Sequence, residues 1–452
     1  MRVNAAKRCA CVCVALLVAA PGVLLHGQQG VRLTLAEAIE QGELANLSAL
    51  EAEARVEEAQ GTVQRRVAAA LLPRVSAEAY ANLQNRNLKA QGLSLSVLPD
   101  VVGPMSNYDV RLSAQQNVVD LASRRAMKAS RLTLDASRLD EQSAKDAIVR
   151  VVAAYYLNAQ SAKARAEAAR SRVTDAETLR KLAVDRHDAG KATGVDVLRA
   201  EVQLANERQL LLEAENESKQ TLLQLARLLG MSPATEIELA EPLQYGAVQP
   251  RSAEALIAAA LAVRADALSL GSQKRALEEQ LRASQARSLP RFTINANIGE
   301  LGRSIGAMKT TGIVQGQVDY TLFDRDRNGE QQEIAARLKS IHAQMDDLRR
   351  GIDEEMREAL LALDSATRQV DVARQGEALA RRELELSQDR FEAGTTNNVE
   401  VITAQDELAR AEENRIVALT RHADAKCKLA HAMGNVKQNT LALMQAVNTE
   451  RN

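Results

Sequence analysis

Aromatic side chains are scarce in this chain of 452 residues, where they make up 2% of the total and tryptophan is absent. A globular core of this length normally uses Phe, Tyr and Trp to bury large surfaces. The abundant Ala, Leu, Glu, Arg and Gln are instead typical of long helices and coiled coils. The formal net charge is -1, and no basic stripe is interleaved with aromatics, so the sequence gives no basis for a nucleic-acid partner.

Cysteine is nearly absent beyond the N-terminus. A basic start precedes the apolar run Cys9–Leu25, which is too short for a membrane span and is followed by polar sequence. This pattern predicts a secretory signal peptide over residues 1–27, with an uncleaved signal anchor as the alternative. Removing the peptide leaves only Cys427, so no intramolecular disulfide can form, and we expect this thiol to pack as a small apolar side chain.

Proline is missing from two long regions. None occurs in 105–232 or in 291–452, and Ala, Leu, Glu and Arg recur there at helical spacing. Proline interrupts a helix because it lacks an amide hydrogen and clashes with the preceding turn. Both regions can therefore run as long unbroken helices.

What the chain does contain is an internal repeat. The segment "RHDAGKATGVDVLRAEVQL" (Arg186–Leu204) matches "RFEAGTTNNVEVITAQDEL" (Arg390–Leu408) at an offset of 204 residues. Upstream, "LLPR" (Leu71–Arg74) matches "SLPR" (Ser288–Arg291) at an offset of 217. The second copy is thus 13 residues shorter between these motifs. Because length varies mainly in loops, residues 88–106 and 302–311 are predicted to be surface loops.

The repeat predicts the same order of elements twice, in a first repeat over 32–245 and a second over 250–435, followed by a polar C-terminal tail over 436–452. Glycines at the predicted helix ends support the boundaries, because glycine is the usual residue just past a helix C-terminus. The expected helices are 34–46, 47–72, 123–188 and 195–230 in the first copy, and 252–263, 265–288, 327–392 and 399–433 in the second. The expected strands are 74–84 and 107–119, then 291–301 and 312–323, and the tips of the helical hairpins 123–230 and 327–433 fall near 186–198 and 390–402.

Strict alternation marks the extended segments. In Tyr108–Val118 one face is largely apolar and the other carries Asp109, Arg111, Ser113, Gln115 and Asn117. About ten residues with this period is the length of a tilted membrane strand, although a soluble antiparallel sheet with one wet face gives the same pattern. Two isolated hairpins supply four strands, which are too few to close a barrel. If they cross a membrane, the chain must oligomerise, because open sheet edges are costly in lipid.

These features together resemble the TolC family of outer-membrane efflux proteins over residues 32–435. The marks are the Leu-Pro that ends each medium helix, the strand ending "LFD" (Leu322–Asp324), and the glycine-centred turn that occurs twice. The resemblance implies a mainly α fold with a small membrane β-barrel: a homotrimer with a 12-stranded β-barrel, continued by a 12-helix periplasmic α-barrel. Helices of 66 residues would reach roughly 100 Å at a rise of 1.5 Å per residue.

The resemblance also implies location and partners. Such a protein lies in the cell outer membrane with a long periplasmic extension, in contact with outer-membrane lipid. It gives passive, gated exit to small molecules or proteins as the outer component of a tripartite efflux or type I secretion system. Its partners would be a periplasmic adaptor (membrane fusion) protein and an inner-membrane pump of RND, ABC or MFS type. The sequence leaves the cargo and the particular pump open.

At the tips, the resemblance implies a gate and a docking surface for the adaptor. Asp196 and Glu400 lie six positions after the turn glycines, where they could form a carboxylate ring, and Arg199 and Thr403 stand where a second acid can occur. Arg199 could instead hold the tip shut by pairing with a neighbouring acid. The alternative for Asp196 and Glu400 is that they are helix-start acids, and for Arg186 and Arg390 that they are charges at a helix C-terminus. The predicted docking residues are Arg186, Gly190, Val195, Arg390, Phe391, Gly394 and Val399.

No catalytic or cofactor-binding constellation is present in the sequence. The histidines of the mature chain are scattered, without the close pair and nearby acid that a zinc site needs. No phosphate-binding loop or serine-centred elbow occurs. We therefore expect no enzyme activity, cofactor or metal. The alternative function is a periplasmic coiled-coil adaptor or scaffold without channel activity, although the lipoyl-like and β-barrel modules of that class are missing.

Overall fold

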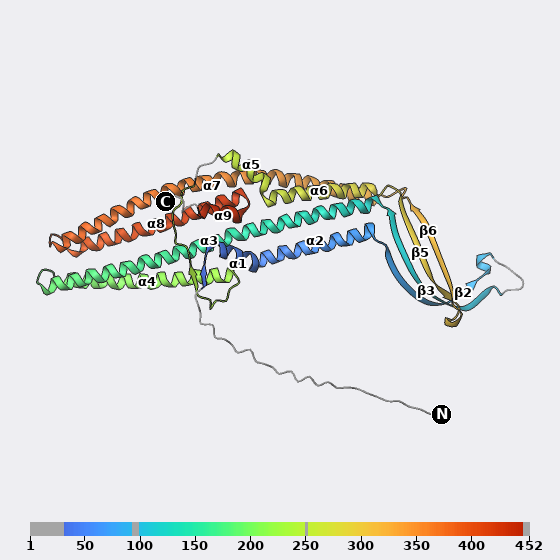
Figure 1. Cartoon of the computed structure of the whole chain (residues 1–452), viewed down its shortest axis with the longest axis horizontal. Coiled ribbons are helices and arrows are strands. Elements are labelled where there is room, and N and C mark those ends of the chain that lie inside the picture. The colour runs from blue at the N-terminus through green and yellow to red at the C-terminus, as the bar shows by residue number, and fades with distance from the viewer. Residues whose placement is uncertain (1–30, 93–98, 249–251, 446–452) are drawn as a thin grey trace, which may run out of the picture.

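The computed structural model describes residues 31–92, 99–248 and 252–445, so the predicted signal peptide 1–27 lies outside the described residues. The molecule is elongated, with a sheet at one end and two helical hairpins side by side that end at the other (Figure 1). The helices are α1 Leu35–Ala45, α2 Leu47–Leu71, α3 Leu121–Asp188, α4 Gly194–Leu228, α5 Ala253–Val263, α6 Ala265–Ala286, α7 Asp326–Glu392, α8 Asn398–Met433 and α9 Val436–Gln445. The strands are β1 Val31–Leu33, β2 Arg74–Asn87, β3 Val101–Val119, β4 Ile237–Leu239, β5 Arg291–Gly302 and β6 Lys309–Asp319, with short 3₁₀ helices at Lys89–Gln91 and Ile305–Ala307.

The bounds of α1 to α8 differ from the predicted ranges by at most two residues. The long helices form a curved layer. Toward the sheet, α3 lies between α2 and α6, and α6 packs on α7; toward the hairpin ends, α3 lies between α4 and α8, and α8 packs on α7. On this arrangement α2 and α4 form one edge of the layer and α7 forms the other.

The predicted ends of β2, β3 and β6 were wrong by three residues or more: β2 runs to Asn87, and β6 begins at Lys309, inside the predicted loop 302–311. The predicted loop 88–106 contains the start of β3, because the ladder with β2 resumes after a register shift and pairs Asn87 with Val101. Strand β6 ends at Asp319 and not at residue 323, because Asp319 already lies opposite Arg291, the first residue of β5. Pro290, just before that residue, has no amide hydrogen to extend the ladder.

Two apolar core clusters lie midway along the helices: α1 and α9 cover the larger one and α5 covers the other (Figure 1). Tyr156 of α3 is fully buried in the larger cluster, and its hydroxyl donates to the backbone oxygen of Leu33 at 3.1 Å. Leu33 belongs to β1, which pairs in parallel with β4. Cys427 packs in the same core with 3% of its surface exposed, which confirms the expectation of a small buried apolar residue. The three-residue strands β1 and β4 were not anticipated from the sequence.

The prediction of a polar C-terminal tail from residue 436 was wrong over 436–445, which form α9. Val436 and Thr440 are each 1% exposed, and Leu441 and Met444 pack against the core. Lys437 adds an ion pair with Glu43 of α1 at 2.6 Å. The segment is helical because its apolar residues gather on one face, which is buried, and its polar residues lie on the other.

None of the described helices is by itself long and apolar enough to cross a membrane. Helices α5 and α6 meet the length and composition requirement only as a pair, and they are bent by 49° where they join.

A buried histidine in the helical core is expected to make the fold sensitive to acid. His422 is 1% exposed, stacks on Tyr245 at 4.8 Å, and has no hydrogen-bond partner for either ring nitrogen among the described residues. Burial, together with the charges of Lys426 and Arg374, lowers its pKa to about 4. An unfolded histidine titrates near pH 6.5, so the unfolded state alone takes up a proton as the pH falls from about 6.5 toward 4.

We therefore expect the free energy of unfolding to decrease on acidification, by roughly 2 kcal/mol between pH 7 and pH 5 from this group. Thermal unfolding midpoints measured at both pH values should show a smaller shift for His422→Leu than for the wild type. The exposed His342 is the matched control, because His342→Leu should keep the wild-type shift. Equal shifts in wild type and His422→Leu would assign the acid sensitivity to other groups.

Candidate functional site: sheet faces, polar hollow and hairpin tips

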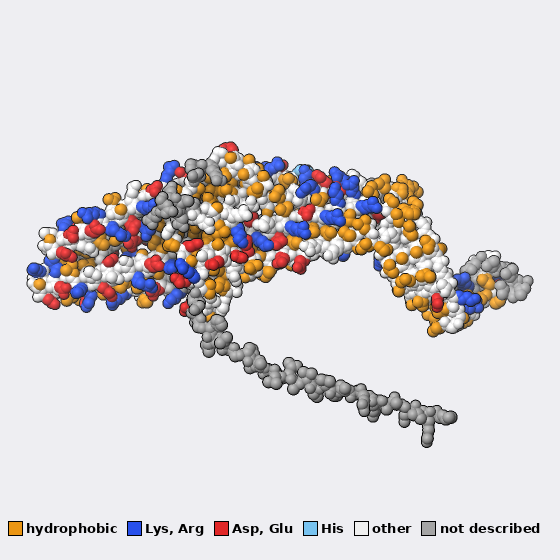
Figure 2. Space-filling view, viewed as in Figure 1, with side chains coloured by type: hydrophobic (Ala, Val, Ile, Leu, Met, Phe, Trp, Pro, Cys, Tyr) orange, Lys and Arg blue, Asp and Glu red, His pale blue; other side chains and the backbone are white. Residues whose placement is uncertain are grey.

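The four long strands form one antiparallel sheet in the order β2-β3-β5-β6. The register places apolar side chains of all four strands on the same face, and exposed hydrophobic side chains cover this end of the molecule (Figure 2). Val314, at the centre of β6, is 77% exposed. The apolar face comprises Val75, Ala77, Ala79, Val110, Leu112, Ala114, Ile294, Ala296, Ile298, Val314 and Val318.

The opposite face of the sheet is polar and carries one tight cluster. Asp109 is 1% exposed and accepts a hydrogen bond from the Tyr80 hydroxyl at 2.6 Å and from Arg111 Nε at 2.9 Å. Gly299 lies across the ladder from Arg111, and a Cβ at this glycine would fall 2.5 Å from the Cβ of Arg111. The glycine thus gives the arginine room to lie along the sheet and neutralise Asp109.

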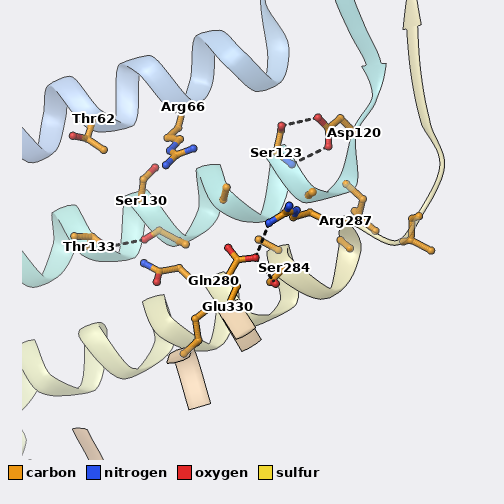
Figure 3. Close-up of a pocket in the computed structure, with 18 of the residues that line it drawn as sticks. Thr62, Arg66, Asp120, Ser123, Ser130, Thr133, Gln280, Ser284, Arg287 and Glu330 are labelled. Carbon is orange, nitrogen blue, oxygen red and sulfur yellow. Dashed lines mark hydrogen bonds and ion pairs between the residues drawn. The ribbon is translucent and has the colours of Figure 1, made fainter. Parts of the chain in front are cut away.

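A polar hollow of about 1140 Å³ lies on one side of the helical layer, just below the sheet (Figure 3). It is lined by α2, α3, α6 and α7. Its wall carries hydroxyls, amides and both signs of charge; Arg287 donates to Glu330 at 2.8 Å, and Ser284 donates to the same carboxylate at 2.6 Å. Arg66 lines the hollow from α2 without an ion pair among the described residues.

The hollow is continuous with the polar face of the sheet. Arg291 and Asp319 line it, pair with each other at 3.5 Å, and occupy the polar register of β5 and β6. One side of the molecule is therefore polar from the strands into the helices. This continuous surface has the chemistry of a wetted wall, whereas the other side of the sheet has the chemistry of a lipid-facing wall.

At the far end, each helical hairpin reverses at a glycine. Gly190 has φ 70° and Gly394 has φ 77°, a left-handed conformation that residues with a Cβ rarely adopt. The amide after each glycine donates back to the carbonyl of Arg186 and of Arg390, at 2.8 and 3.0 Å respectively. These bonds satisfy carbonyls at the ends of α3 and α7 and fix the direction of the turn.

Arg186 connects the two hairpins at their tips. Its guanidinium donates to the backbone oxygens of Phe391 and Glu392, the latter at 3.1 Å, and lies 4.7 Å over the Phe391 ring. Phe391 is 2% exposed and packs with Leu179 and Val401. Arg186 and Phe391, predicted as docking residues, thus form a contact between the hairpins, and the Phe391 ring is not accessible to a docking partner in this conformation.

A second contact between the two hairpins was not predicted from the sequence. Asn398, at the start of α8, is fully buried, and its amide nitrogen donates to the backbone oxygen of Asp196 at 2.7 Å. The first repeat has Gly194 at the matching position. The sequence signal that could have revealed this contact was therefore an amide side chain in the second repeat, at a position where the first repeat has a glycine.

The two predicted gate acids are both bonded within their own hairpins. Asp196 forms a capping box with Thr193, whose hydrogen bonds lower the pKa of this carboxyl, and lies 3.8 Å from Arg199. Glu400 accepts from Arg390 at 2.6 Å. The structure therefore places both acids at helix starts, each beside an arginine.

The remaining predicted tip residues are at the surface. Val195 is 54% exposed and Val399 is 43% exposed. The hydroxyl of Thr403 donates to the backbone oxygen of Val399 at 2.9 Å, within α8. The two valines are thus the exposed apolar groups among the predicted docking residues.

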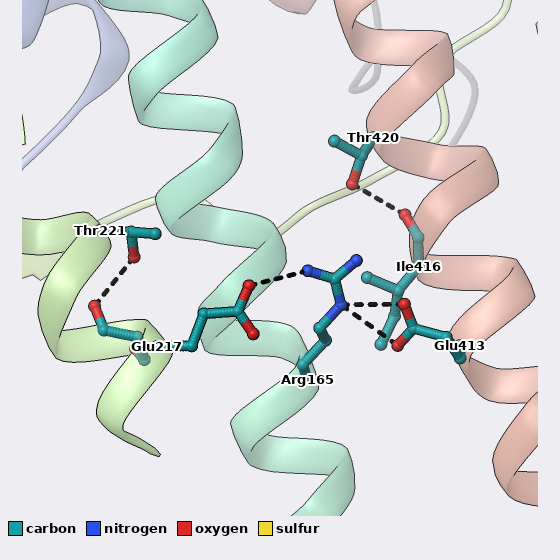
Figure 4. A network of polar contacts seen from close by, with 7 residues as sticks. Arg165, Glu217, Thr221, Glu413, Ile416 and Thr420 are labelled. Atoms are coloured by element: carbon teal, nitrogen blue, oxygen red, sulfur yellow. Dashed lines mark hydrogen bonds and ion pairs between the residues drawn. The ribbon is translucent and has the colours of Figure 1, made fainter. Parts of the chain in front are cut away.

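Farther from the tips, a second arginine joins three helices. Arg165 of α3 donates through Nε to Glu413 of α8 at 2.9 Å and through a terminal nitrogen to Glu217 of α4 at 3.4 Å (Figure 4). Its side chain is 31% exposed, so this network is partly screened by water. The two hairpins are connected here and again at Arg186.

A sheet with one apolar and one polar face, attached to long helices that continue the polar side, is the arrangement expected of an outer-membrane channel protein. The chain belongs to the outer membrane efflux protein family, whose model matches residues 39–231 and 256–435. Proteins of this family lie in the outer membrane and extend into the periplasm; they are channels. Among the described residues, no group of three or more His, Cys, Asp or Glu side chains is placed to hold a metal ion.

Similar proteins agree with this assignment. The pyoverdine export outer membrane protein OpmQ of Pseudomonas aeruginosa is 25% identical over 399 residues, which are 84% of this chain and 81% of the relative. The outer membrane protein VceC of Vibrio cholerae has a TM-score of 0.73 at 20% identity, covering 88% of this chain and 96% of that one. The MtrE outer membrane channel of Neisseria gonorrhoeae, in its open state, has a TM-score of 0.74 at 17% identity, covering 90% of each chain.

Proposed function

We propose that this protein is the outer component of a tripartite efflux system, a passive and gated duct for small molecules. The observation that carries the proposal is the four-stranded sheet, with one apolar face, one polar face and unpaired edges at β2 and β6. In lipid such edges would leave backbone groups without partners, at several kcal/mol each. A closed barrel shared between copies removes the edges.

Three copies supply twelve strands and close the barrel. The helical layer supports the same assembly, since its edges at α4 and α7 carry exposed apolar side chains: Leu198 is 61% exposed, Val202 60%, Val372 69% and Leu379 72%. Packing α4 or α2 of one copy against α7 of the next buries these side chains and closes the helices into a tube. The polar hollow and the polar face of the sheet then line a continuous passage.

The relative OpmQ is described as a pyoverdine export protein, and this favours small-molecule export over protein secretion as the role of the present chain. The described part of the passage wall carries mixed charges and hydroxyls around the polar hollow. Such a wall suits a conduit that accepts varied polar cargo. An inner-membrane pump of RND, ABC or MFS type would supply energy and select cargo, and a periplasmic adaptor would join the pump to exposed tip residues such as Val195 and Val399.

The tip contacts support a gate held by fastenings between hairpins. Arg186 and Asn398 each bond one hairpin to the backbone of the other. The carboxylates of Asp196 and Glu400 can still face the entrance, but each is partly neutralised by an arginine. Opening would separate the hairpins at Arg186 while the Arg165 network holds them farther up.

Expression of the full chain in a Gram-negative host tests the proposal. We expect detergent-resistant trimers in the outer-membrane fraction, and single-channel currents when purified protein is added to planar bilayers. A monomer in the soluble periplasmic fraction would contradict the channel and favour a coiled-coil adaptor or scaffold. Trimers that insert into the membrane but do not conduct, even after the Arg186 contact between the hairpins is removed, would contradict the role as a duct. They would still support the location in the membrane.

A further inference from the structure

A basic cluster lies on the side of α3 and α6 opposite the hollow. Helix α3 carries no acid between Asp120 and Asp135, but four cations fall in this interval. Counted at 100° per residue from Ala126, which lines the hollow, three of the four lie roughly 140° or more around the helix. The cluster comprises Arg124, Arg125, Lys128 and Arg131 of α3, with Arg282 of α6.

The cluster is organised around one buried carboxylate. Glu279, with 4% of its side chain exposed, accepts from Arg125 at 3.0 Å, Lys128 at 2.9 Å and Arg282 at 2.7 Å. These three cations are 38 to 56% exposed, so each keeps donors directed to solvent. One carboxylate cannot balance three cations. Glu279 therefore fixes the positions of the three cations and leaves a net positive surface.

The other two cations of the α3 group, Arg124 and Arg131, do not bond Glu279. Arg124 is exposed and donates to the backbone oxygen of Val118 at 3.3 Å, at the end of β3. Arg131 is exposed and has no ion pair among the described residues. The cluster is carried once per chain, because the positions that match these two in the second repeat are Asn328 and Ala335.

Large exposed apolar side chains lie beside the basic cluster, where the strands meet the helices. Tyr320, Leu322 and Phe323, between β6 and α7, are 57%, 87% and 84% exposed, and none of them lines the hollow. In Figure 2, hydrophobic side chains gather where the strands meet the helices, and Lys and Arg side chains gather over the adjoining helices. Aromatic residues prefer the interface of a bilayer, and cations beside it reach lipid headgroups.

The cluster stays accessible in the proposed trimer. Helices α3 and α6 are the inner helices of the layer next to the sheet, and α2 and α7 are its edges. Neighbouring copies would cover the edges, not the outward face of α3 and α6. A ring of three such clusters would then surround the tube just below the membrane.

We propose that the Arg124–Arg131 cluster with Arg282 binds the phosphate headgroups of anionic phospholipids in the leaflet that faces the helices. This inference rests on the proposed membrane-spanning trimer. Guanidinium groups suit the task because their forked donors match phosphate oxygens. Binding would hold the trimer at a fixed depth, with Tyr320 and Phe323 at the interface and the arginines among the headgroups.

The test uses the purified full-length trimer in detergent micelles that contain equal amounts of phosphatidylglycerol and phosphatidylcholine. Lipid retained by the protein is counted by native mass spectrometry. The variant is Arg124→Gln with Arg131→Gln, because neither side chain bonds Glu279 and the buried carboxylate stays paired. Each basic residue near an anionic surface contributes about a fivefold preference, so the variant should lose at least fivefold in retained phosphatidylglycerol relative to phosphatidylcholine.

The matched control is Arg350→Gln with Arg368→Gln, which removes two exposed arginines farther along α7 and should keep the wild-type ratio. An unchanged ratio in the cluster variant would overturn the inference. Displacement of the lipid by an equal concentration of inorganic phosphate would assign the cluster to free phosphate and would also overturn it. Failure of the proposed function is recognised separately, since the wild type would then not form outer-membrane trimers.

Discussion

Replacing Val314 by arginine is expected to remove the protein from the outer membrane. Val314 is 77% exposed at the centre of β6, on the apolar face of the sheet. Arginine on the lipid face of a barrel costs about 2–4 kcal/mol at the bilayer midplane, and the trimer would carry three. We expect the outer-membrane trimer to fall to a small fraction of the wild-type amount in fractionation and heat-modifiability gels, with the remainder degraded or aggregated in the periplasm.

The neighbouring position supplies the control. Gln315 lies on the polar face, paired with Asn295, so Gln315→Arg introduces the same side chain one residue away. Because successive strand residues point to opposite faces, this arginine would face the passage. Normal trimer levels for Gln315→Arg and loss for Val314→Arg would establish which face meets lipid. Equal levels of both variants would contradict the membrane assignment of this sheet.

The strands and long helices could be predicted because their signals are local. Alternation along β3 and β5, and the proline that precedes each first strand, set the faces and starts of the hairpins. The strand ends were harder, because they depend on the partner strand: Val101 is in β3 only because Asn87 extends β2 to meet it. Likewise α9 is held by contacts with distant elements, such as Lys437 with Glu43, that no local pattern reveals.

The tips show the same division between local and long-range signals. The turn glycines and the helix-start acids were recognisable from spacing, and Gly190 and Gly394 have the left-handed backbone that such turns need. The partner of Arg186 lies 205 residues away, on the backbone of the other hairpin. A backbone acceptor has no sequence signature, so Arg186 could be predicted as a tip residue but its bonding to the second hairpin could not.

Arg186→Ala should open the tip and increase single-channel conductance severalfold in planar bilayers. The substitution removes two hydrogen bonds from a charged donor and the contact with the Phe391 ring. Bonds to charged groups contribute about 1.5–3 kcal/mol each and an exposed cation–π contact about 0.5–1 kcal/mol. In the proposed trimer, a loss of this size repeated in three copies would be enough to shift a closed tip toward an open one.

Two comparisons decide what the conductance change means. Arg382→Ala removes an arginine of α7 whose one ion pair among the described residues is with Glu385 of the same helix, and it should leave conductance at the wild-type value. Asp196→Ala with Glu400→Ala tests the carboxylate ring, which predicts higher conductance or weaker cation preference. If Arg186→Ala opens the channel while the double variant changes only ion preference, the hairpin fastening is the gate and the acids set selectivity. If the double variant opens the channel and Arg186→Ala does not, the ring is the gate and Arg186 only braces the hairpins.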